Sequence, residues 1–312
     1  ALGAMSGEAI FSRLRTLLAR PEVDVREAAL HSAVRRPSRG LLDLILPPLL
    51  EPDLHHAART ALAAIGNPAV PPLLRMVEGG HAPRAQSLAA RALAEIDTRA
   101  AVDALLTMVR SQDLRLRHLG LMGLARIRAR KGRPILPRHR AHRLFLRELS
   151  DYRRCLDPAA ALETNPAPEV RLLADSYRES AEMALERALQ ALSCWYDPRP
   201  LAGVFERLKS PDRRTASPAL EFLEHVLPRA LFRPVRRIFE EAAAVPAGQA
   251  DGSEPLAIWI DGAWRSEDVW LRACAVRASR SVTGFDRSLF AGENHAPMIR
   301  DEIALLRSTG PC

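Results

Sequence analysis

The sequence predicts an all-α protein, a right-handed solenoid of antiparallel helix pairs with a longer helical hairpin near its middle. Three observations support this prediction. Alanine, leucine and arginine are abundant while only 5% of residues are aromatic, a composition that favours helices over sheets. Hydrophobic residues make up 47% of 312 positions, enough to bury a core. An amphipathic pattern recurs about every thirty residues, the range typical of stacked repeats.

The repeat has an apolar or small residue at its start, a small one four positions later, and apolar ones eight and eleven positions later. Its four starts are Val25, Leu54, Ala85 and Leu116. The small residues are Ala29, Ala58, Ala89 and Gly120, and the later apolar residues are Leu62, Leu93, Leu124, Ile65, Ile96 and Ile127. The first copy is degenerate, with Ala33 and Arg36 at the later positions. A small residue at the fixed position lets a neighbouring helix approach closely.

A second apolar stretch lies in each unit, at 40–50, 67–77 and 98–110. Each begins with a turn or capping residue, Gly40, Asn67 or Thr98, which is typical of a helix start after a short connection. Each unit is therefore expected to be an antiparallel helix pair.

The period breaks in the second half of the chain. Residues 141–163 and 168–195 indicate two longer helices, separated by "TNPAP", and repeat-like units then resume. The predicted organisation is a tag remnant or linker at 1–8, repeats at 9–130, a basic connector at 131–140, a long helical hairpin at 141–200, and further repeats at 201–312 with a mobile loop at 245–256.

The repeat residues resemble the HEAT consensus, most clearly in "PEVDVREAA" at 21–29 and "AARTALAAIG" at 57–66. Most of the chain after residue 10 also resembles the soluble carboxyl-terminal domain of bacterial nucleotide carriers similar to ATP/ADP translocases. The matching residues are Leu208, Ser210, Asp212, Arg214, Ala219, Leu220, Glu221, Leu223, Leu227 and "WLRACA" at 270–275. Pro218 and the insert at 245–264 depart from that pattern, and no transport residue can be carried over.

This resemblance implies a non-catalytic scaffold that binds a protein partner or its own parent membrane domain. It implies a cytoplasmic location, at the cytoplasmic face of the inner membrane. The four cysteines are far apart and form no C-x-x-C pair, which favours reduced thiols in the same compartment. No run approaches the roughly 18 apolar residues that span a bilayer.

The formal net charge of +8 comes from one stretch, residues 126–143, which contains no carboxylate. The rest of the chain carries 37 acidic and 37 basic side chains. The eight cationic residues are Arg126, Arg128, Arg130, Lys131, Arg133, Arg138, Arg140 and Arg143. Since Gly132, Pro134 and Pro137 interrupt any helix here, we expect a connector that contacts anionic phosphates such as lipid headgroups. The alternative is a solvated linker whose arginines cover helix ends.

Nucleic acid is the competing partner, in a HEAT-like protein of the DNA glycosylase type. Trp195, Tyr196 and Asp197 place aromatic rings beside a carboxylate, as such a site would require. A duplex also needs positive charge on successive repeats, and the surplus here lies in one stretch. Trp195 and Tyr196 close an amphipathic helix, which favours a packed position in the core over a place in such a site.

Other chemistry has little support in the sequence. His55 and His56 are adjacent and point to different faces of a helix, and His139 and His142 lie among arginines that repel a cation, so no metal site is predicted. The sequence contains neither a glycine-rich phosphate loop nor a nucleophile elbow, and the expectation is a protein that is not an enzyme and needs no cofactor.

Tryptophans near the C-terminus form a second candidate for partner binding. Trp259 and Trp264 follow the expected loop, where exposed indoles would anchor a protein or a membrane interface. A packed position in the core is the equal alternative for both. Trp270 precedes a repeat motif and is expected to be packed.

Overall fold

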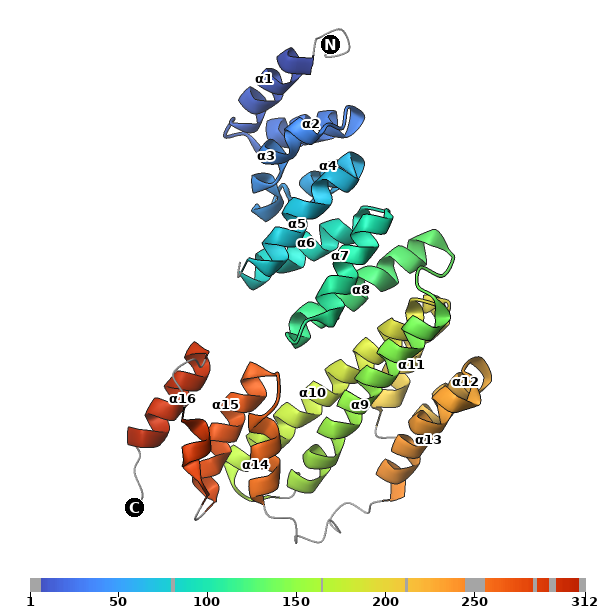
Figure 1. Cartoon of the computed structure of the whole chain (residues 1–312), viewed down its shortest axis with the longest axis vertical. Coiled ribbons are helices and arrows are strands. Elements are labelled where there is room, and N and C mark those ends of the chain that lie inside the picture. Colours follow the sequence, from blue (N-terminus) through green and yellow to red (C-terminus); the bar gives the residue numbers. More distant parts are fainter. Residues whose placement is uncertain are drawn as a thin grey trace. The chain divides into compact units, whose positions relative to one another are not determined.

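The computed structural model describes residues 7–79, 82–163, 165–210, 213–244, 256–282, 285–291 and 296–308. Over these residues the chain forms sixteen α-helices and short 3-10 turns, with no strand, so the prediction of an all-α protein is confirmed (Figure 1). None of the described helices is long and apolar enough to cross a membrane. The chain divides into two compact units, Ala1–Ile135 and Leu136–Cys312.

Unit 1 consists of eight helices joined by short turns. They are α1 (Gly7–Leu18), α2 (Val23–Arg35), α3 (Leu42–Ile45), α4 (His55–Ile65), α5 (Val70–Glu78), α6 (Pro83–Glu95), α7 (Arg99–Arg110) and α8 (Leu114–Lys131). Three 3-10 turns, Arg39–Leu41, Pro47–Leu50 and Asn67–Ala69, flank α3 and precede α5. Helices α2, α4, α6 and α8 pack in sequence against one another, and α5 and α7 pack against α6 and α8.

The small repeat residues lie where helices approach closely. Ala58 and Ala89 are fully buried. A Cβ atom on Gly120 would lie 2.8 Å from the Leu105 carbonyl oxygen and 2.9 Å from Val109 Cγ2, both on α7. Only glycine therefore fits at this point of α8, although it costs about 1 kcal/mol of helix stability relative to alanine.

Polar side chains connect successive helices of unit 1. Arg26 of α2 pairs with Glu51 at 2.5 Å, and Arg59 of α4 pairs with Glu95 of α6. The buried amide of Gln86 on α6 donates to the Val77 carbonyl at 2.8 Å. Each contact joins segments that follow one another in unit 1 and so helps to fix how they pack.

The basic connector is shorter than the expected 131–140. Helix α8 continues to Lys131 and ends at Gly132, whose φ of 65° is the left-handed conformation that glycine adopts most easily. Helix α9 begins at Arg138, with Pro137 as its N-cap residue. A proline is tolerated at a helix start because the first N–H groups have no intrahelical partner, so Pro137 starts α9 instead of extending the connector.

Unit 2 contains the longest helices, α9 (Arg138–Leu162) and α10 (Pro168–Ser193), which pack along each other (Figure 1). Arg187 of α10 and Glu148 of α9 form an ion pair between them, with Nε and Oε2 2.6 Å apart. Their side chains are 3% and 0% exposed. The hairpin core therefore contains a charged pair removed from water.

The remaining helices of unit 2 are α11 (Pro198–Lys209), α12 (Arg213–Val226), α13 (Arg229–Ala244), α14 (Leu256–Trp264), α15 (Val269–Ala278) and α16 (Pro297–Ser308). Helices α14, α15 and α16 share a core with the first half of α10. Helices α11 and α12 follow the end of α10, and α13 packs against α12 and α9. The expected loop at 245–256 falls outside the described residues except for Leu256, which begins α14.

Helix α12 contains a proline. It begins at Arg213 and includes Pro218, one of the residues that depart from the carrier-domain pattern. Because Pro218 lies beyond the first turn of α12, it removes one intrahelical backbone hydrogen bond. Ala219, Leu223 and Leu227 are buried.

Candidate anion-binding surface

The eight cationic residues of the basic stretch occupy both units. Arg126, Arg128, Arg130 and Lys131 lie in the last turns of α8, Arg133 lies in the connection after it, and Arg138, Arg140 and Arg143 lie in the first turns of α9.

Two members on α8 already bind other parts of unit 1. Arg130 Nη2 donates to the Ala94 carbonyl at 2.7 Å, at the C-terminal end of α6. Lys131 Nζ lies 2.8 Å from Asp97 Oδ1, just beyond that end. A cation at a helix C-terminus is favourable because the last carbonyls are unsatisfied and carry negative partial charge. Both side chains therefore cover a helix end, which is the solvated-linker alternative for these two positions.

Arg128 is also unsuited to contact an external surface. It is 8% exposed, and its Nε has no hydrogen-bond acceptor among the described residues. The sequence does not predict that Arg128 is buried, because an arginine within a run of charged residues is normally solvated.

Arg126 belongs to an arginine cluster that spans three adjacent helices of unit 1. Burial, followed by the charges of Arg91 on α6 and Arg59 on α4, lowers the pKa of Arg126, and Glu95 partly offsets them. Arg59 pairs with Glu95 and also donates to His56 Nδ1 at 3.0 Å. We call Arg59, Arg91 and Arg126 the three-helix arginine cluster; it has one carboxylate for three guanidinium groups.

In unit 2, the start of α9 is exposed and cationic. Arg138, Arg140 and Arg143 are exposed, whereas Ala141 between them is fully buried. The first turn of α9 has no acidic residue. Since free N–H groups already make a helix N-terminus positive, the three arginines add to a field that attracts anions. We call Arg138, Arg140 and Arg143 the α9 arginines.

His142 lies beside this site and is held by an aromatic contact. Its Nε2 is 3.1 Å from the Tyr196 hydroxyl, and the two rings stack with centroids 5.9 Å apart. Burial and the charge of Arg138 lower the pKa of His142. The imidazole is therefore neutral at neutral pH, and the α9 arginines supply the positive charge.

The Trp195–Asp197 cluster has a structural role in which its carboxylate is occupied. Asp197 is the N-cap residue of α11 and accepts from the Arg199 amide at 3.0 Å. Its other oxygen pairs with the Arg199 guanidinium at 3.2 Å. Capping contacts of this kind stabilise a helix start by about 1 kcal/mol, so they explain the aspartate without a reaction.

The tryptophans of unit 2 differ in burial, and Trp270 is exposed where the sequence predicts a packed residue. Trp259 and Trp264 are partly buried and pack against the core of unit 2. Trp264 makes an edge contact with Phe290 at 4.9 Å between centroids, and the Arg272 guanidinium lies 4.5 Å from its ring centroid. Trp270 is 42% exposed, because Leu271 and Cys274 form the buried side of α15. The exposed indole in this region is thus Trp270.

The histidines and cysteines give no support for metal or thiol chemistry within the described residues. Within the described ranges, no group of three or more His, Cys, Asp and Glu side chains could hold a metal ion. His55 contacts the Pro52 carbonyl and His56 contacts Arg59, so they point apart. Burial raises the pKa of Cys155 to about 11 and also raises that of Cys274, which leaves both thiols protonated at neutral pH.

No protein-family model matches the sequence, and a search of curated proteins finds no match.

Proposed function

We propose that the chain is a non-catalytic scaffold, a right-handed solenoid of HEAT-like repeats, that binds a phosphate-bearing partner through the α9 arginines. The observation that carries this proposal is the exposed start of α9, where three arginines and the helix N-terminus act without an acidic residue in the first turn. Arginine binds phosphate through charge-assisted, often bidentate hydrogen bonds. The sequential packing of α2, α4, α6 and α8 supports the repeat architecture.

The partner that fits best is the anionic headgroup layer of a membrane. Basic residues close to such a surface contribute about 1 kcal/mol each, so three α9 arginines give a weak, salt-sensitive attraction. We further propose that the chain is a cytoplasmic domain of a nucleotide-carrier-like membrane protein, whose parent keeps it beside the bilayer. The residues that resemble the carrier domain include Leu208, Leu223 and Leu271, which are buried. They support a similar core more than a similar binding surface.

Nucleic acid is the second candidate, and one observation favours it. The three-helix arginine cluster places a cationic side chain on each of α4, α6 and α8, and a phosphate backbone needs positive charge on successive elements. Glu95 lies within that cluster and opposes a continuous cationic track. The α9 site therefore remains the stronger basis for a function.

Co-sedimentation with vesicles tests the proposal. The native chain is expected to bind phosphatidylserine-containing vesicles at low salt and to dissociate from them as the salt concentration rises. It is expected not to bind vesicles of phosphatidylcholine alone. Replacing Arg138, Arg140 and Arg143 with glutamine should abolish binding.

The matched control is a triple glutamine variant of Arg171, Arg207 and Arg300, three exposed arginines of the same unit. It has the same net charge as the α9 variant and should bind as the native chain does. Equal loss in both variants would mean that only net charge matters. A mobility shift with duplex DNA that depends on Arg91 and Arg126, with no vesicle binding, would favour the second candidate.

A further inference from the structure

Helices α6 and α8 of unit 1 pack against each other and run in the same direction. Two arginines of α8 fix this alignment from opposite ends of the helix. The Arg115 guanidinium donates to the Pro83 carbonyl at 2.9 Å, and the Arg130 guanidinium donates to the Ala94 carbonyl at 2.7 Å. These contacts join residues that are 32 and 36 positions apart. A residue in the middle of α8 therefore lies level with a residue of α6 at a similar separation.

Arg91 and Arg126 meet this condition and bring two cationic side chains together. They belong to the three-helix arginine cluster and are 35 positions apart, and both reach the solvent. Burial, and then the charge of Arg91, lower the pKa of Arg126, which indicates that the two guanidinium groups are close. Glu95 lies one turn after Arg91 on α6 and so shares its face, where Arg59 reaches it from α4.

The two carboxylates at the C-terminal end of α6 already have cationic partners. Glu95 pairs with Arg59, which also donates to His56 Nδ1 at 3.0 Å. Asp97 Oδ1 lies 2.8 Å from Lys131 Nζ. Neither carboxylate is therefore available as a full counter-ion for the arginines on the α8 side of the cluster.

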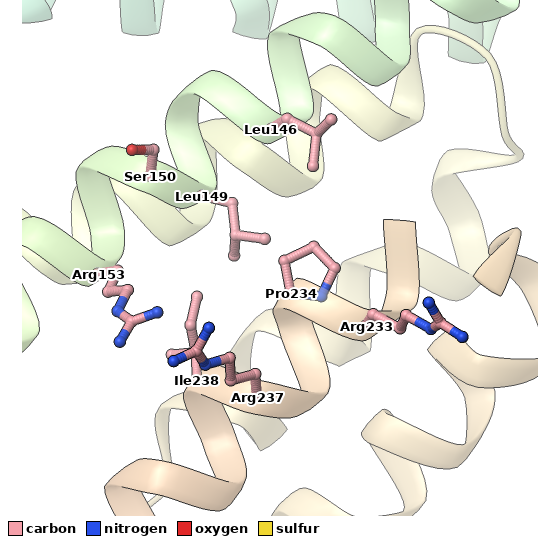
Figure 2. A pocket seen from close by; sticks show the side chains of 8 residues that line it. All are labelled: Leu146, Leu149, Ser150, Arg153, Arg233, Pro234, Arg237 and Ile238. Carbon is pink, nitrogen blue, oxygen red and sulfur yellow. The ribbon is translucent and has the colours of Figure 1, made fainter. Parts of the chain in front are cut away.

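Arg91 and Arg126 form no side-chain hydrogen bond or ion pair within the described residues. The remaining residues of unit 1, at 1–6, 80 and 81, include no aspartate or glutamate. The pocket of about 410 Å³ between α9 and α13 of unit 2 is different, because Arg153 and Arg237, which line it, each interact with other residues (Figure 2). Two neighbouring guanidinium groups repel each other, and an anion between them removes that repulsion.

We infer that Arg91 and Arg126 bind one compact anion of the class of phosphate monoesters and inorganic pyrophosphate. Each guanidinium group offers a fork of donors that matches two phosphate oxygens. The three arginines and one carboxylate of the cluster leave an excess of two positive charges, which a dianion balances. Because Glu95 interrupts the positive charge toward α4, the cluster suits a compact anion better than a long phosphate backbone. The inference uses none of the α9 arginines and is independent of vesicle binding.

Calorimetric titration of the full chain with inorganic pyrophosphate, and separately with methyl phosphate, tests this inference. The titration is carried out in a chloride buffer at low ionic strength, because exposed charges are screened by salt. Saturable binding is expected, and it should persist in the variant with glutamine at Arg138, Arg140 and Arg143. That variant removes any phosphate bound at the start of α9, so failure of one site leaves the other site testable.

Arginine variants then place the site. Arg91→Gln and Arg126→Gln should each weaken pyrophosphate binding about tenfold, the loss typical of one charge-assisted hydrogen bond. Both side chains are exposed, so both variants are expected to fold, which circular dichroism checks. Arg110→Gln, at the exposed end of α7, has the same change in net charge and should bind as the native chain does.

A carboxylate variant gives a result of opposite sign. Glu95→Gln removes the one carboxylate of the cluster and frees Arg59, so it should tighten pyrophosphate binding several-fold. Asp103→Asn is the matched control, because it likewise removes one negative charge and frees an arginine, Arg99, on the surface of α7. It should leave the affinity unchanged.

Four results would overturn the inference. The first is the absence of saturable binding by both anions. The second is equal weakening by Arg110→Gln, which would mean that only net charge matters. The third is a Glu95→Gln variant that folds and binds no more tightly than Asp103→Asn. The fourth is duplex DNA that binds through Arg91 and Arg126 and is not displaced by pyrophosphate, which would assign the cluster to nucleic acid.

Discussion

Removing one partner of the buried ion pair between Glu148 and Arg187 should strongly destabilise unit 2. The two side chains are 0% and 3% exposed and 2.6 Å apart, so either single replacement leaves a charge in the core without its counterion. Breaking such a pair costs about 3–5 kcal/mol. For a domain of this size, each kcal/mol lowers the melting temperature by about 2–4 °C, which gives a decrease of roughly 10 °C.

The double replacement distinguishes this reasoning from simple loss of packing. Glu148→Leu and Arg187→Leu each leave one member of the pair without the other, whereas the variant with both leucines removes the pair as a whole. Replacing a buried pair by apolar residues is often neutral or stabilising by about 1–4 kcal/mol. We therefore expect the double variant to be more stable than either single variant, with a coupling energy of several kcal/mol between the two positions.

The protein contains its own reporter for this experiment. All four tryptophans, Trp195, Trp259, Trp264 and Trp270, lie in unit 2, so intrinsic fluorescence follows the unfolding of that unit during a urea or thermal titration. Arg265→Leu is the control, since Arg265 pairs with Asp261 on the surface of the same unit and should cost less than about 0.5 kcal/mol. Single variants that lose less than about 1 kcal/mol, or a double variant that loses the sum of both, would refute the argument.

Three further predictions follow from local geometry. Gly120→Ala should destabilise unit 1 by about 1–3 kcal/mol, because its Cβ would clash with Leu105. A thermal melt followed by circular dichroism measures this loss. Gly203→Ala is the control: open space surrounds Gly203, so the change should be neutral or stabilising by up to about 1 kcal/mol. His142 should titrate below its usual pKa in an NMR experiment, and Arg138→Gln should raise that pKa. Since the folded pKa of His142 is the lower one, its contribution to stability is present above the unfolded value and is lost as pH falls through the folded value. Cys155 should react with iodoacetamide far more slowly at neutral pH in the native chain than in urea, and equal rates would contradict its raised pKa.

The all-helical fold could be predicted because its signals are local. Helical periodicity and small residues recur within each repeat, and the prediction for Gly120 needs only the statement that another helix passes close by. Helix ends were less predictable. The predicted interruption of the helix near Gly132, Pro134 and Pro137 is confirmed, but the sequence did not indicate that Pro137 would be the N-cap residue of α9. Pro218, in contrast, lies inside α12.

The candidate site depended on contacts that sequence spacing does not specify. The charged run around Arg130 and Lys131 is typical of solvated side chains, but the partners of both residues lie at the C-terminal end of α6. The three-helix arginine cluster likewise cannot be predicted from the sequence alone, because it depends on how α4, α6 and α8 pack against one another. The pocket between α9 and α13 joins residues that are far apart in the chain, so no local pattern could have indicated it.

The start of α9 is electrostatically frustrated. A helix N-terminus is stabilised by negative side chains, yet here arginines occupy the positions where aspartate or glutamate would normally lie. The first turn therefore gains order from any anion that settles on it, and binding and local helix stability become thermodynamically linked. Backbone amides of this turn should exchange rapidly with solvent in the free protein and become protected when a phosphate surface is present.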